Sequence, residues 1–317
     1  MDVRQKFLGS LLGAALGDAL GAFYEGQRMA SQQQVEELRS VRQPLVYTDD
    51  THMTVGVAES LVECGRADGG HMAKRFMENY FREPWRGYGP GPPRVFRLMA
   101  DGEPWNTAAA HIYPGGSFGN GAAMRVAPVG LFYWDRPAAL RQAVETSSII
   151  THCHPLGVEG ALLQARAVAM AVAQVPDEPL DAGAFVRGLE NLVTEGVYRA
   201  RLGVLEKLLG HAGDRELVVN QLGHGIEAFN SVPTAIFAFL ANQRDFVSTV
   251  LYAISLGGDT DTIASMAGAV CGACLGAEAL PREWLEKLEN RDYIAGLADR
   301  LWLASSAQGD RQQGQPG

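Results

Sequence analysis

The sequence has 317 residues, of which 47% are hydrophobic and 20% are charged, and its formal net charge is −9. This composition is ample for a buried core and ordinary for a soluble enzyme. No basic block offsets the negative charge, so nucleic acid is not expected as a partner. A small anionic substrate is still compatible with it, provided that a local cation or backbone N–H groups receive the substrate.

The N-terminal stretch 7–23, FLGSLLGAALGDALGAF, is apolar enough to suggest a signal peptide or a short membrane span. Asp18 lies inside this stretch, where a carboxylate is costly, and the run barely reaches spanning length. Glycines recur every four residues from Gly9 to Gly21. That spacing makes one helix face smooth, so that a second helix can approach closely. We therefore predict a buried core helix and no membrane association.

The rest of the chain is helical in pattern nearly throughout. Stretches 53–62 and 158–169 each place apolar residues on one helix face, and Gly268–Gly276 repeats the four-residue glycine spacing. The apolar runs LVYT (45–48) and GLFYW (130–134) are too short to tell strand from helix. Pro and Gly clusters at 84–93 and 114–121 predict loops. These patterns predict one all-α domain over 1–305 and a disordered tail over 306–317, which has no apolar content to bury.

Four cysteines are present, and Cys271 and Cys274 form a C-x-x-C pair. No second pair exists for a structural zinc site, and the pair lies in an apolar helical run. We interpret both as buried structural residues, ahead of a redox role. The cysteine pattern suits a reducing cytosol and predicts a cytoplasmic protein.

Two acidic clusters stand where helices are expected to begin. Asp259 and Asp261 in SLGGDTDTIASMAGA are surrounded by apolar neighbours, and YTDDTHM contains Thr48, Asp49 and Asp50. Helix capping is the simplest explanation for either cluster. However, capping accounts for one carboxylate per helix, and each cluster supplies two. An ionised carboxylate in apolar surroundings must be paired, metal-bound or neutralised.

If the two helix starts converge, they offer only hard oxygen ligands. Such a set suits Mg²⁺, Mn²⁺ or Ca²⁺ and does not suit Zn²⁺. An EF-hand is excluded, because DTDTIASMAGAVC lacks the glycine at its sixth position and the final bidentate glutamate. The predicted ligands are Thr48, Asp49, Asp50, Asp259, Asp261 and Thr262.

A third feature is the glycine-rich segment GGSFGNGAAMR (115–125). Its glycines allow the backbone to approach a ligand closely and to present several N–H groups to an anion. It fits neither the Walker pattern nor the dinucleotide fingerprint, and an ordinary loop is the alternative.

Together these motifs resemble the ADP-ribosylglycohydrolase family from about residue 5 to about residue 303. The GSFGNG loop, the FYE and the SVPTAI look most like the branch that acts on serine-linked ADP-ribose, poly(ADP-ribose) and O-acetyl-ADP-ribose. The segment 176–216 matches poorly. The motifs that carry the resemblance, in order, are GAALGDALGAFYE, YTDDTHM, RGYGPG, GSFGNGAAMRVAP, THCHPLGVEGALLQA, SVPTAIFAFL and SLGGDTDTIASMAGA.

The resemblance implies an all-α, compact orthogonal helical bundle with two Mg²⁺ ions, or Mn²⁺ in their place. The six oxygen ligands above would hold the metals together with Glu25, and Asp261 would bridge them. Glu25, Asp49 and Asp261 are the expected catalytic residues, with Glu25 as the movable acid/base. Phe118 stands where the branch usually has a tyrosine, and it would stack on adenine opposite Ile226. The expected substrate-binding residues are Asp49, Gly115, Gly116, Ser117, Phe118, Gly119, Asn120, Gly121, His152 and Ile226.

The resemblance also implies the reaction, which is hydrolysis of the ribose C1″–O bond to release ADP-ribose. The expected partners are ADP-ribose-containing small molecules or ADP-ribosylated proteins, and a monomer is expected. His154 is expected to be structural or solvent-exposed. Two alternatives stay open at this point: an N-glycohydrolase for ADP-ribosylarginine or dinitrogenase reductase, and a catalytically idle relative that binds ADP-ribose.

Overall fold

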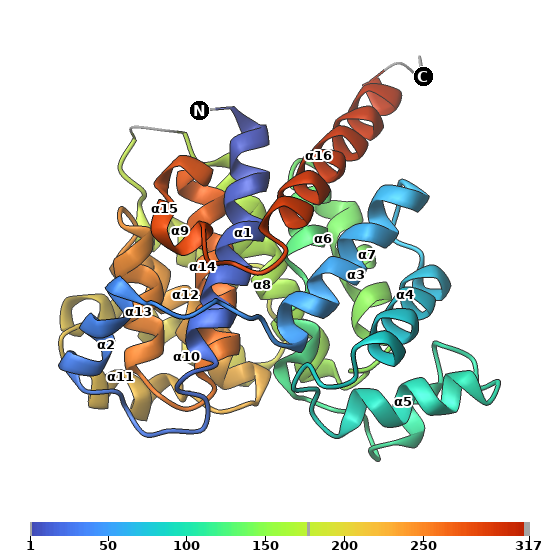
Figure 1. The fold of residues 1–317 in the computed structure, drawn as a ribbon, viewed down its shortest axis with the longest axis horizontal. Helices are drawn as coiled ribbons and strands as arrows, with labels where there is room; N and C mark the ends of the chain where they lie inside the picture. The colour runs from blue at the N-terminus through green and yellow to red at the C-terminus, as the bar shows by residue number, and fades with distance from the viewer. Residues whose placement is uncertain (1, 176–177, 314–317) are drawn as a thin grey trace.

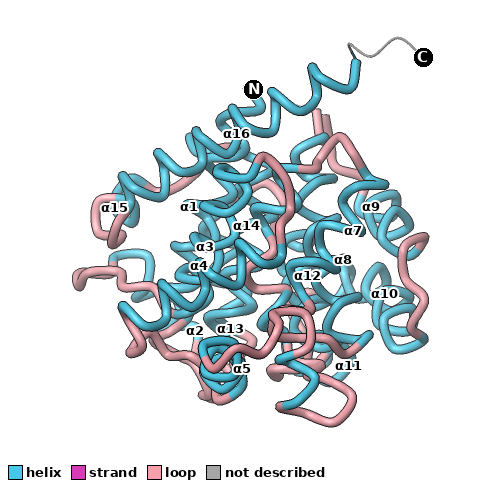
Figure 2. Tube along the Cα trace, turned by 90° about the vertical axis from the view of Figure 1, so that its right-hand side faces the viewer, coloured by secondary structure: helices cyan, strands magenta, loops and turns pink. Residues whose placement is uncertain are grey.

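Almost all of the chain is helical (Figure 1, Figure 2). The structure, a computed structural model, describes residues 2–175 and 178–313. Within those ranges there is no β-strand, only isolated bridges at Leu45–Leu288 and Gly119–Glu227. The run 45–48 is outside the helices and has a single bridge at Leu45, whereas 130–134 is the last part of a helix and the turn that follows it. The all-α prediction is confirmed.

The α-helices are α1 (Val3–Gly21), α2 (Gln32–Glu37), α3 (Asp49–Cys64), α4 (Gly69–Arg82), α5 (Gly91–Ala100), α6 (Ala127–Phe132), α7 (Pro137–Ser148), α8 (Pro155–Ala173), α9 (Ala182–Glu190), α10 (Gly196–Leu208), α11 (Arg215–Leu222), α12 (Ala228–Ala241), α13 (Phe246–Ser255), α14 (Thr260–Leu275), α15 (Arg282–Leu285) and α16 (Arg291–Gln313). The short 3₁₀ helices are η1 (Leu38–Ser40), η2 (Ala108–His111), η3 (Asn120–Ala122), η4 (Leu209–His211) and η5 (Ala277–Ala279).

Helices α1 and α14 form the centre of the molecule and run antiparallel, with the glycine faces in contact. A Cβ placed on Gly9 would lie 2.3 Å from the carbonyl oxygen of Gly272, and one on Gly17 would lie 2.1 Å from that of Ala264. Real Cβ atoms do not come this close to backbone, so only glycine permits the approach. This confirms the helix contact that the four-residue spacing predicts.

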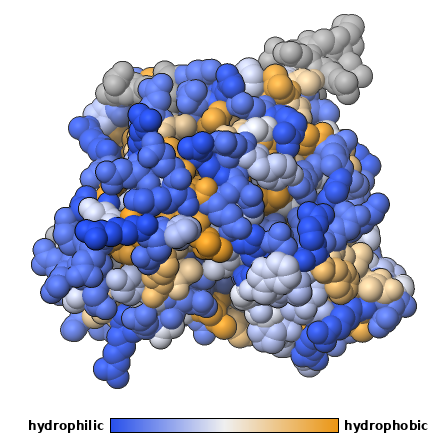
Figure 3. Space-filling model, in the orientation of Figure 1, coloured by the Kyte–Doolittle hydropathy of each residue, from blue (hydrophilic) through white to orange (hydrophobic). Residues whose placement is uncertain are grey.

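The other helices surround this pair. Helix α14 also packs against α8, α12 and α13, and α16 packs against α1, α3 and α6. In Figure 1, α3 to α7 lie on one side of the pair, and α2 and α9 to α13 lie on the other. Apolar residues from Phe7 to Leu301 make one hydrophobic core. Hydrophilic residues cover most of the face in Figure 3, with apolar ones in small groups between them.

The C-terminal helix is longer than the sequence predicts. Disorder is expected from residue 306, but α16 continues to Gln313, and residues 314–317 lie outside the described residues. That part of the prediction is wrong, because a helix makes its backbone hydrogen bonds within the segment and can continue beyond the core.

One helix has the length and apolar composition of a membrane span, and it is α8 rather than α1 among the described residues. Its most apolar window is 72% buried inside the protein, as is common for the core helix of a globular protein.

The C-x-x-C pair lies on α14. Both cysteines are free, and Cys271 is fully buried. Burial raises the pKa of the Cys271 thiol to about 12, which leaves little reactive thiolate. This geometry favours the structural interpretation.

Candidate active site

The two acidic clusters do converge. The N-terminal ends of α3 and α14 meet at a cavity of about 240 Å³, and the turn after α1 brings Glu25 to its rim. The wall also contains Gly87 and Pro90, from a loop to which the sequence assigned no site residue, and Tyr113, which lies just before the glycine-rich segment. The predicted site residues that line this cavity are Glu25, Asp49, Asp50, Ser117, Gly119, Asn120, Gly121, His152, Ile226, Asp259, Asp261 and Thr262.

Four predicted site residues do not line it. Three of them flank Ser117 in the glycine-rich loop: Gly115, Gly116 and Phe118. The Phe118 residue is 45% exposed. Thr48 is the N-cap of α3, and its Oγ1 accepts a hydrogen bond from the backbone N–H of Asp50 at 3.3 Å. If Thr48 also binds a metal, it would do so through the remaining lone pair of this hydroxyl.

Capping does not account for the carboxylates. Because Thr48 caps α3, Asp49 and Asp50 are free of that role. Asp259 holds the N-cap position of α14, but its side chain makes no capping hydrogen bond. Instead it accepts from the Asn120 side-chain amide at 2.5 Å. Asp259 is therefore directed at the cavity and not at the helix end, whereas Oδ1 of Asp261 accepts the Thr262 backbone N–H at 2.9 Å.

Two glycines set the position of Asp259. Gly257 and Gly258 have φ angles of +71° and +76°, which side-chain-bearing residues rarely adopt. A Cβ on Gly258 would lie 2.1 Å from the carbonyl oxygen of His224. That carbonyl accepts the backbone N–H of Asp259 at 2.9 Å, so the tight turn aims the aspartate into the site.

Asp18 organises the start of α3, a role that the sequence did not reveal. It is fully buried, and its carboxylate accepts the backbone N–H groups of Thr48 and Thr51 at 2.9–3.1 Å. It also accepts both threonine hydroxyls, at 2.8 and 2.5 Å. The residue thus ties the glycine-faced helix α1 to the first acidic cluster. The signal was present, since a carboxylate inside an apolar helix needs partners.

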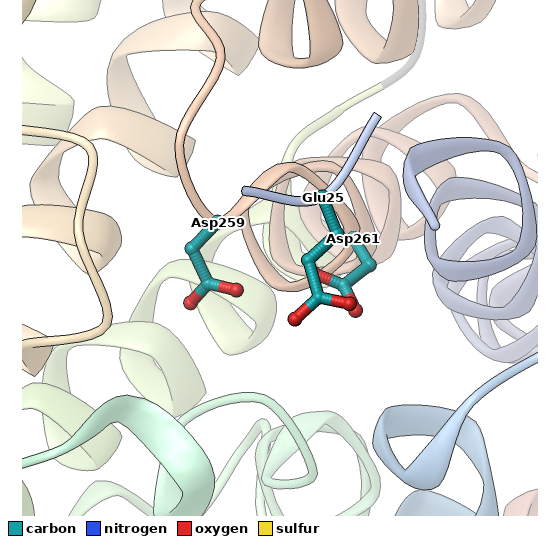
Figure 4. A group of neighbouring side chains, drawn as sticks. All are labelled: Glu25, Asp259 and Asp261. Carbon is teal, nitrogen blue, oxygen red and sulfur yellow. The ribbon is translucent and has the colours of Figure 1, made fainter. Parts of the chain in front are cut away.

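Three carboxylates come together in a group that could hold a cation. Oxygen atoms of Glu25, Asp259 and Asp261 all lie within 4.8 Å of one another (Figure 4). The two aspartates are at most 8% exposed. Asp50 lies beside this group, with the Thr262 hydroxyl 3.4 Å from its Oδ1. Its Oδ2 is buried and has no hydrogen-bond partner within the described part of the chain.

The electrostatics of the site favour protonated carboxyl groups unless a cation is bound. Burial raises the pKa of Asp49 to about 8 and of Asp261 to about 9, and the charges of Asp18 and Asp259 respectively add to the two shifts. The pKa of Asp50 is raised well above its usual range, first by burial and then by Asp18. Like charges this close cannot all ionise alone.

The donor set fits hard divalent cations. Carboxylate and hydroxyl oxygens are the ligands that Mg²⁺, Mn²⁺ and Ca²⁺ prefer. Among the described residues that line the cavity, only Met124 carries sulfur and only His152 carries imidazole. The unpartnered Oδ2 of Asp50 is the atom that most needs a positive charge.

The glycine-rich loop borders the acidic cluster. Asn120 connects the two, since its side-chain amide also donates to the Ser231 hydroxyl at 3.0 Å and its backbone N–H donates to the Ile226 carbonyl at 2.9 Å. In the described structure, the backbone N–H groups of Ser117 and Phe118 have no protein acceptor. They are available to an anion beside the acidic site.

The glycine-rich loop carries an exposed aromatic side chain, Phe118. The Phe118 ring lies edge-on to His154, with centroids 5.6 Å apart, and tilted against Phe229 at 6.1 Å. Ile226, which is 67% exposed, lines the neighbouring cavity. His154 itself is the N-cap of α8, and its Nδ1 accepts the Leu156 N–H at 3.1 Å. That contact gives His154 a structural role.

The chain matches one family along nearly its whole length. A sequence model described as ADP-ribosylglycohydrolase matches residues 1–311. The chain belongs to the ADP-ribosylglycohydrolase family. As a member of the ADP-ribosylglycohydrolase family, it is a hydrolase.

Individual relatives agree with this assignment. ADP-ribosylhydrolase ARH3 of Mus musculus is 38% identical over 344 residues, covering 95% of this chain and 93% of its own. The protein of the same name from Homo sapiens is 36% identical, covering 93% and 92%. The ADP-ribosyl-[dinitrogen reductase] glycohydrolase of Rhodospirillum rubrum is 28% identical, covering 91% and 92%.

The fold of the ADP-ribosylglycohydrolase family is also found by structural comparison. A solved structure described as an ADP-ribosylglycohydrolase-related protein complex aligns with a TM-score of 0.75 at 27% identity. The alignment covers 96% of this chain and 99% of that one.

Proposed function

We propose that this hydrolase is metal-dependent and releases ADP-ribose from O-linked substrates, namely serine-linked ADP-ribose, poly(ADP-ribose) and O-acetyl-ADP-ribose. The observation that carries the proposal is the buried, unpartnered Oδ2 of Asp50 inside a cluster of oxygen donors. A buried acceptor of this kind is rare in native proteins and asks for an unseen partner.

The expected metal is a pair of Mg²⁺ ions, with Mn²⁺ as a substitute. When bound, such ions supply Lewis-acid assistance and a template for the ribose hydroxyls and a water. The residues proposed to hold them are Glu25, Thr48, Asp49, Asp50, Asp259, Asp261 and Thr262.

The protein's own groups would handle the proton. The C1″–O bond breaks with its electron pair on the leaving oxygen, which takes up a proton, and water adds to C1″ and loses one. Partial burial of its carboxyl and the charges of Asp259 and Asp18 raise the pKa of Glu25. A raised pKa makes a carboxyl a better proton carrier in general acid/base catalysis than an ordinary glutamate. Glu25 is therefore the proposed acid/base, with Asp49 and Asp261 beside the reacting ribose.

The glycine-rich loop is the proposed pyrophosphate and distal ribose site. The N–H groups of Ser117 and Phe118 have no protein acceptor in the described structure and would donate to anionic oxygens. Such local donors are needed because the overall charge of the protein is negative. Phe118 and Ile226 would flank the adenine. For the O-linked class, the support is the resemblance of the GSFGNG loop, FYE and SVPTAI to the family branch that acts on such substrates. We further propose a cytoplasmic monomer.

The test is a panel of serine-linked, polymeric, O-acetyl and arginine-linked ADP-ribose, assayed for ADP-ribose release with Mg²⁺ and with EDTA. Asp50→Ala and Asp261→Ala should abolish turnover and weaken Mg²⁺ binding in calorimetry. Asp292→Ala is the matched control, because this aspartate is on the surface of α16 with its side chain 86% exposed. Full activity in EDTA would refute the metal, and preferred cleavage of the arginine linkage would refute the O-linked class alone.

A further inference from the structure

Behind the glycine-rich loop lies a buried guanidinium. Arg125 is 0% exposed, and no carboxylate pairs with it in the part of the chain that the structure describes. Its Nη1 donates to the Gly121 carbonyl at 2.9 Å and to the Thr151 hydroxyl at 2.8 Å, and its Nη2 donates to the Ser147 carbonyl at 2.9 Å. Burying a guanidinium costs free energy, and the proposed reaction assigns no role to Arg125.

The contact with Thr151 has a chemical consequence. Arginine only donates, so the Thr151 Oγ1 must be the acceptor. The same Oγ1 lies 2.8 Å from Nδ1 of His152, and Thr151 is 4% exposed. Its hydroxyl proton has no other acceptor within hydrogen-bonding distance among the described residues. The proton therefore goes to Nδ1, because the opposite arrangement would leave a buried O–H unsatisfied.

Because Nδ1 accepts a hydrogen bond, the protonation state of the other ring nitrogen, Nε2, is determined. A neutral imidazole carries one N–H, so Nε2 must hold it. Burial, and then the charge of Arg125, lower the pKa of His152 to about 3, which keeps the ring neutral. A Cβ on Gly121 would lie 2.9 Å from Nε2, so the ring edge lies directly against the loop.

The ring faces the ligand cavity. His152, Thr151, Gly119 and Gly121 all line it. The Nε2 atom makes no hydrogen bond to the residues that the structure describes. An Nε2–H would donate to an oxygen of a bound ligand, whereas an Nδ1–H tautomer would turn a bare lone pair toward that oxygen and repel it.

We propose that Arg125 and Thr151 are positioning residues that fix His152 as the Nε2–H tautomer, so that the ring donates a hydrogen bond to an oxygen of ADP-ribose. The identity of the ligand rests on the proposed function, but the tautomer does not. This role accounts for a buried cation that has no carboxylate partner among the described residues, because its Nη1 donates to the Thr151 hydroxyl and so sets the direction of the hydrogen bonds.

The test is nitrogen-15 NMR of histidine-labelled full-length protein at about pH 8, where ordinary histidines are neutral. A long-range proton–nitrogen correlation distinguishes protonated from unprotonated ring nitrogens, and His152→Asn assigns the signals. Two internal references are present. His154 accepts at Nδ1 from the Leu156 N–H, and His224 donates from Nδ1 to the Leu256 carbonyl at 2.8 Å.

His152 should show the same pattern as His154 and the opposite of His224. In Thr151→Val, its nitrogen shifts should move toward the average of the two tautomers, while those of the two references stay unchanged. Thr151→Ser should keep the wild-type pattern. In calorimetry, ADP-ribose affinity should fall about tenfold in Thr151→Val and less than about twofold in Thr151→Ser. Arg125→Met should weaken ADP-ribose binding much less in the Thr151→Val background than in the wild type. This is expected if both residues act through the same series of hydrogen bonds.

An Nδ1–H or a charged His152 in the wild type overturns the proposal, and so does a Thr151→Val spectrum with unchanged shifts at His152. The wild-type spectrum gives this decision even if a variant fails to fold. If the tautomer is as stated but the protein does not bind ADP-ribose, the proposed function fails and the tautomer assignment stands.

Discussion

The substitution Gly17→Ala tests whether the central helix contact positions the active site. Its Cβ would lie 2.1 Å from the carbonyl oxygen of Ala264. Ordinary contacts begin at about 3.5 Å, so α1 and α14 must separate by roughly 1.4 Å. No side chain can rotate away, because the obstacle is backbone. Overpacking of a core typically costs about 1–3 kcal/mol, and a backbone obstacle puts the expected loss of unfolding free energy near the upper end.

The displacement of the two helices should also lower turnover. Asp18 follows Gly17 directly and holds the start of α3, whereas Asp261 lies one turn before Ala264 on α14. Separating the helices would therefore separate the two acidic clusters. A shift of about 1 Å at reacting groups can reduce turnover by about 10²-fold, and a loss of that order is expected.

The assay is urea unfolding with Mg²⁺ present, together with ADP-ribose release by the folded fraction. The matched control is Gly203→Ala in α10, where an added Cβ meets nothing within 4 Å. That change should stabilise the protein by about 0.5–1 kcal/mol, since alanine suits a helix interior better than glycine.

A Gly17→Ala protein that unfolds at the same urea concentration as the wild type would refute the packing argument. A protein that is destabilised but turns over normally would refute only the connection between the helix contact and the site.

The remaining predictions concern the site itself. Because burial raises the folded-state pKa values of Asp49 to about 8 and Asp261 to about 9, these groups stabilise the metal-free protein when protonated, and that contribution is lost as pH rises. The melting temperature in EDTA should thus fall progressively between about pH 4, near the ordinary aspartate pKa, and about pH 9, and stabilisation by added Mg²⁺ should grow; a pH-independent Mg²⁺ effect would contradict this. Glu25→Gln should lower turnover by about 10²-fold or more while ADP-ribose still binds in calorimetry; near-native turnover would remove Glu25 as acid/base. Phe118→Ala should weaken ADP-ribose binding by roughly tenfold, because stacking is worth ~1–1.5 kcal/mol beyond burial, and Phe118→Tyr should be close to neutral. Equal affinity of Phe118→Ala and wild type would mean that the ring does not touch the base.

The sequence was sufficient to predict the helical fold and to suggest that the two acidic helix starts meet. Glycine spacing in 9–21 and 268–276 specifies a close helix pair, because only hydrogen at Cα permits it. Paired carboxylates at two helix starts exceed what capping needs, which identified Asp49, Asp50, Asp259 and Asp261 as one cluster. Both signals are local, since each depends on residue type and spacing alone.

Other features depend on contacts between distant segments, which spacing cannot show. In the sequence, Asp18 only argued against a membrane span. In the fold, Thr48 and Thr51, 30 and 33 residues away, supply its four hydrogen-bond donors. In the sequence, Arg125 and Thr151 belong to two separate motifs. In the fold, hydrogen bonds connect Arg125 to Thr151 and Thr151 to His152. Hydrogen-bond direction is decided by which donors and acceptors meet in space. For this protein, the sequence therefore determined which groups gather at the site, and only the tertiary structure decided which of them hold the others in place.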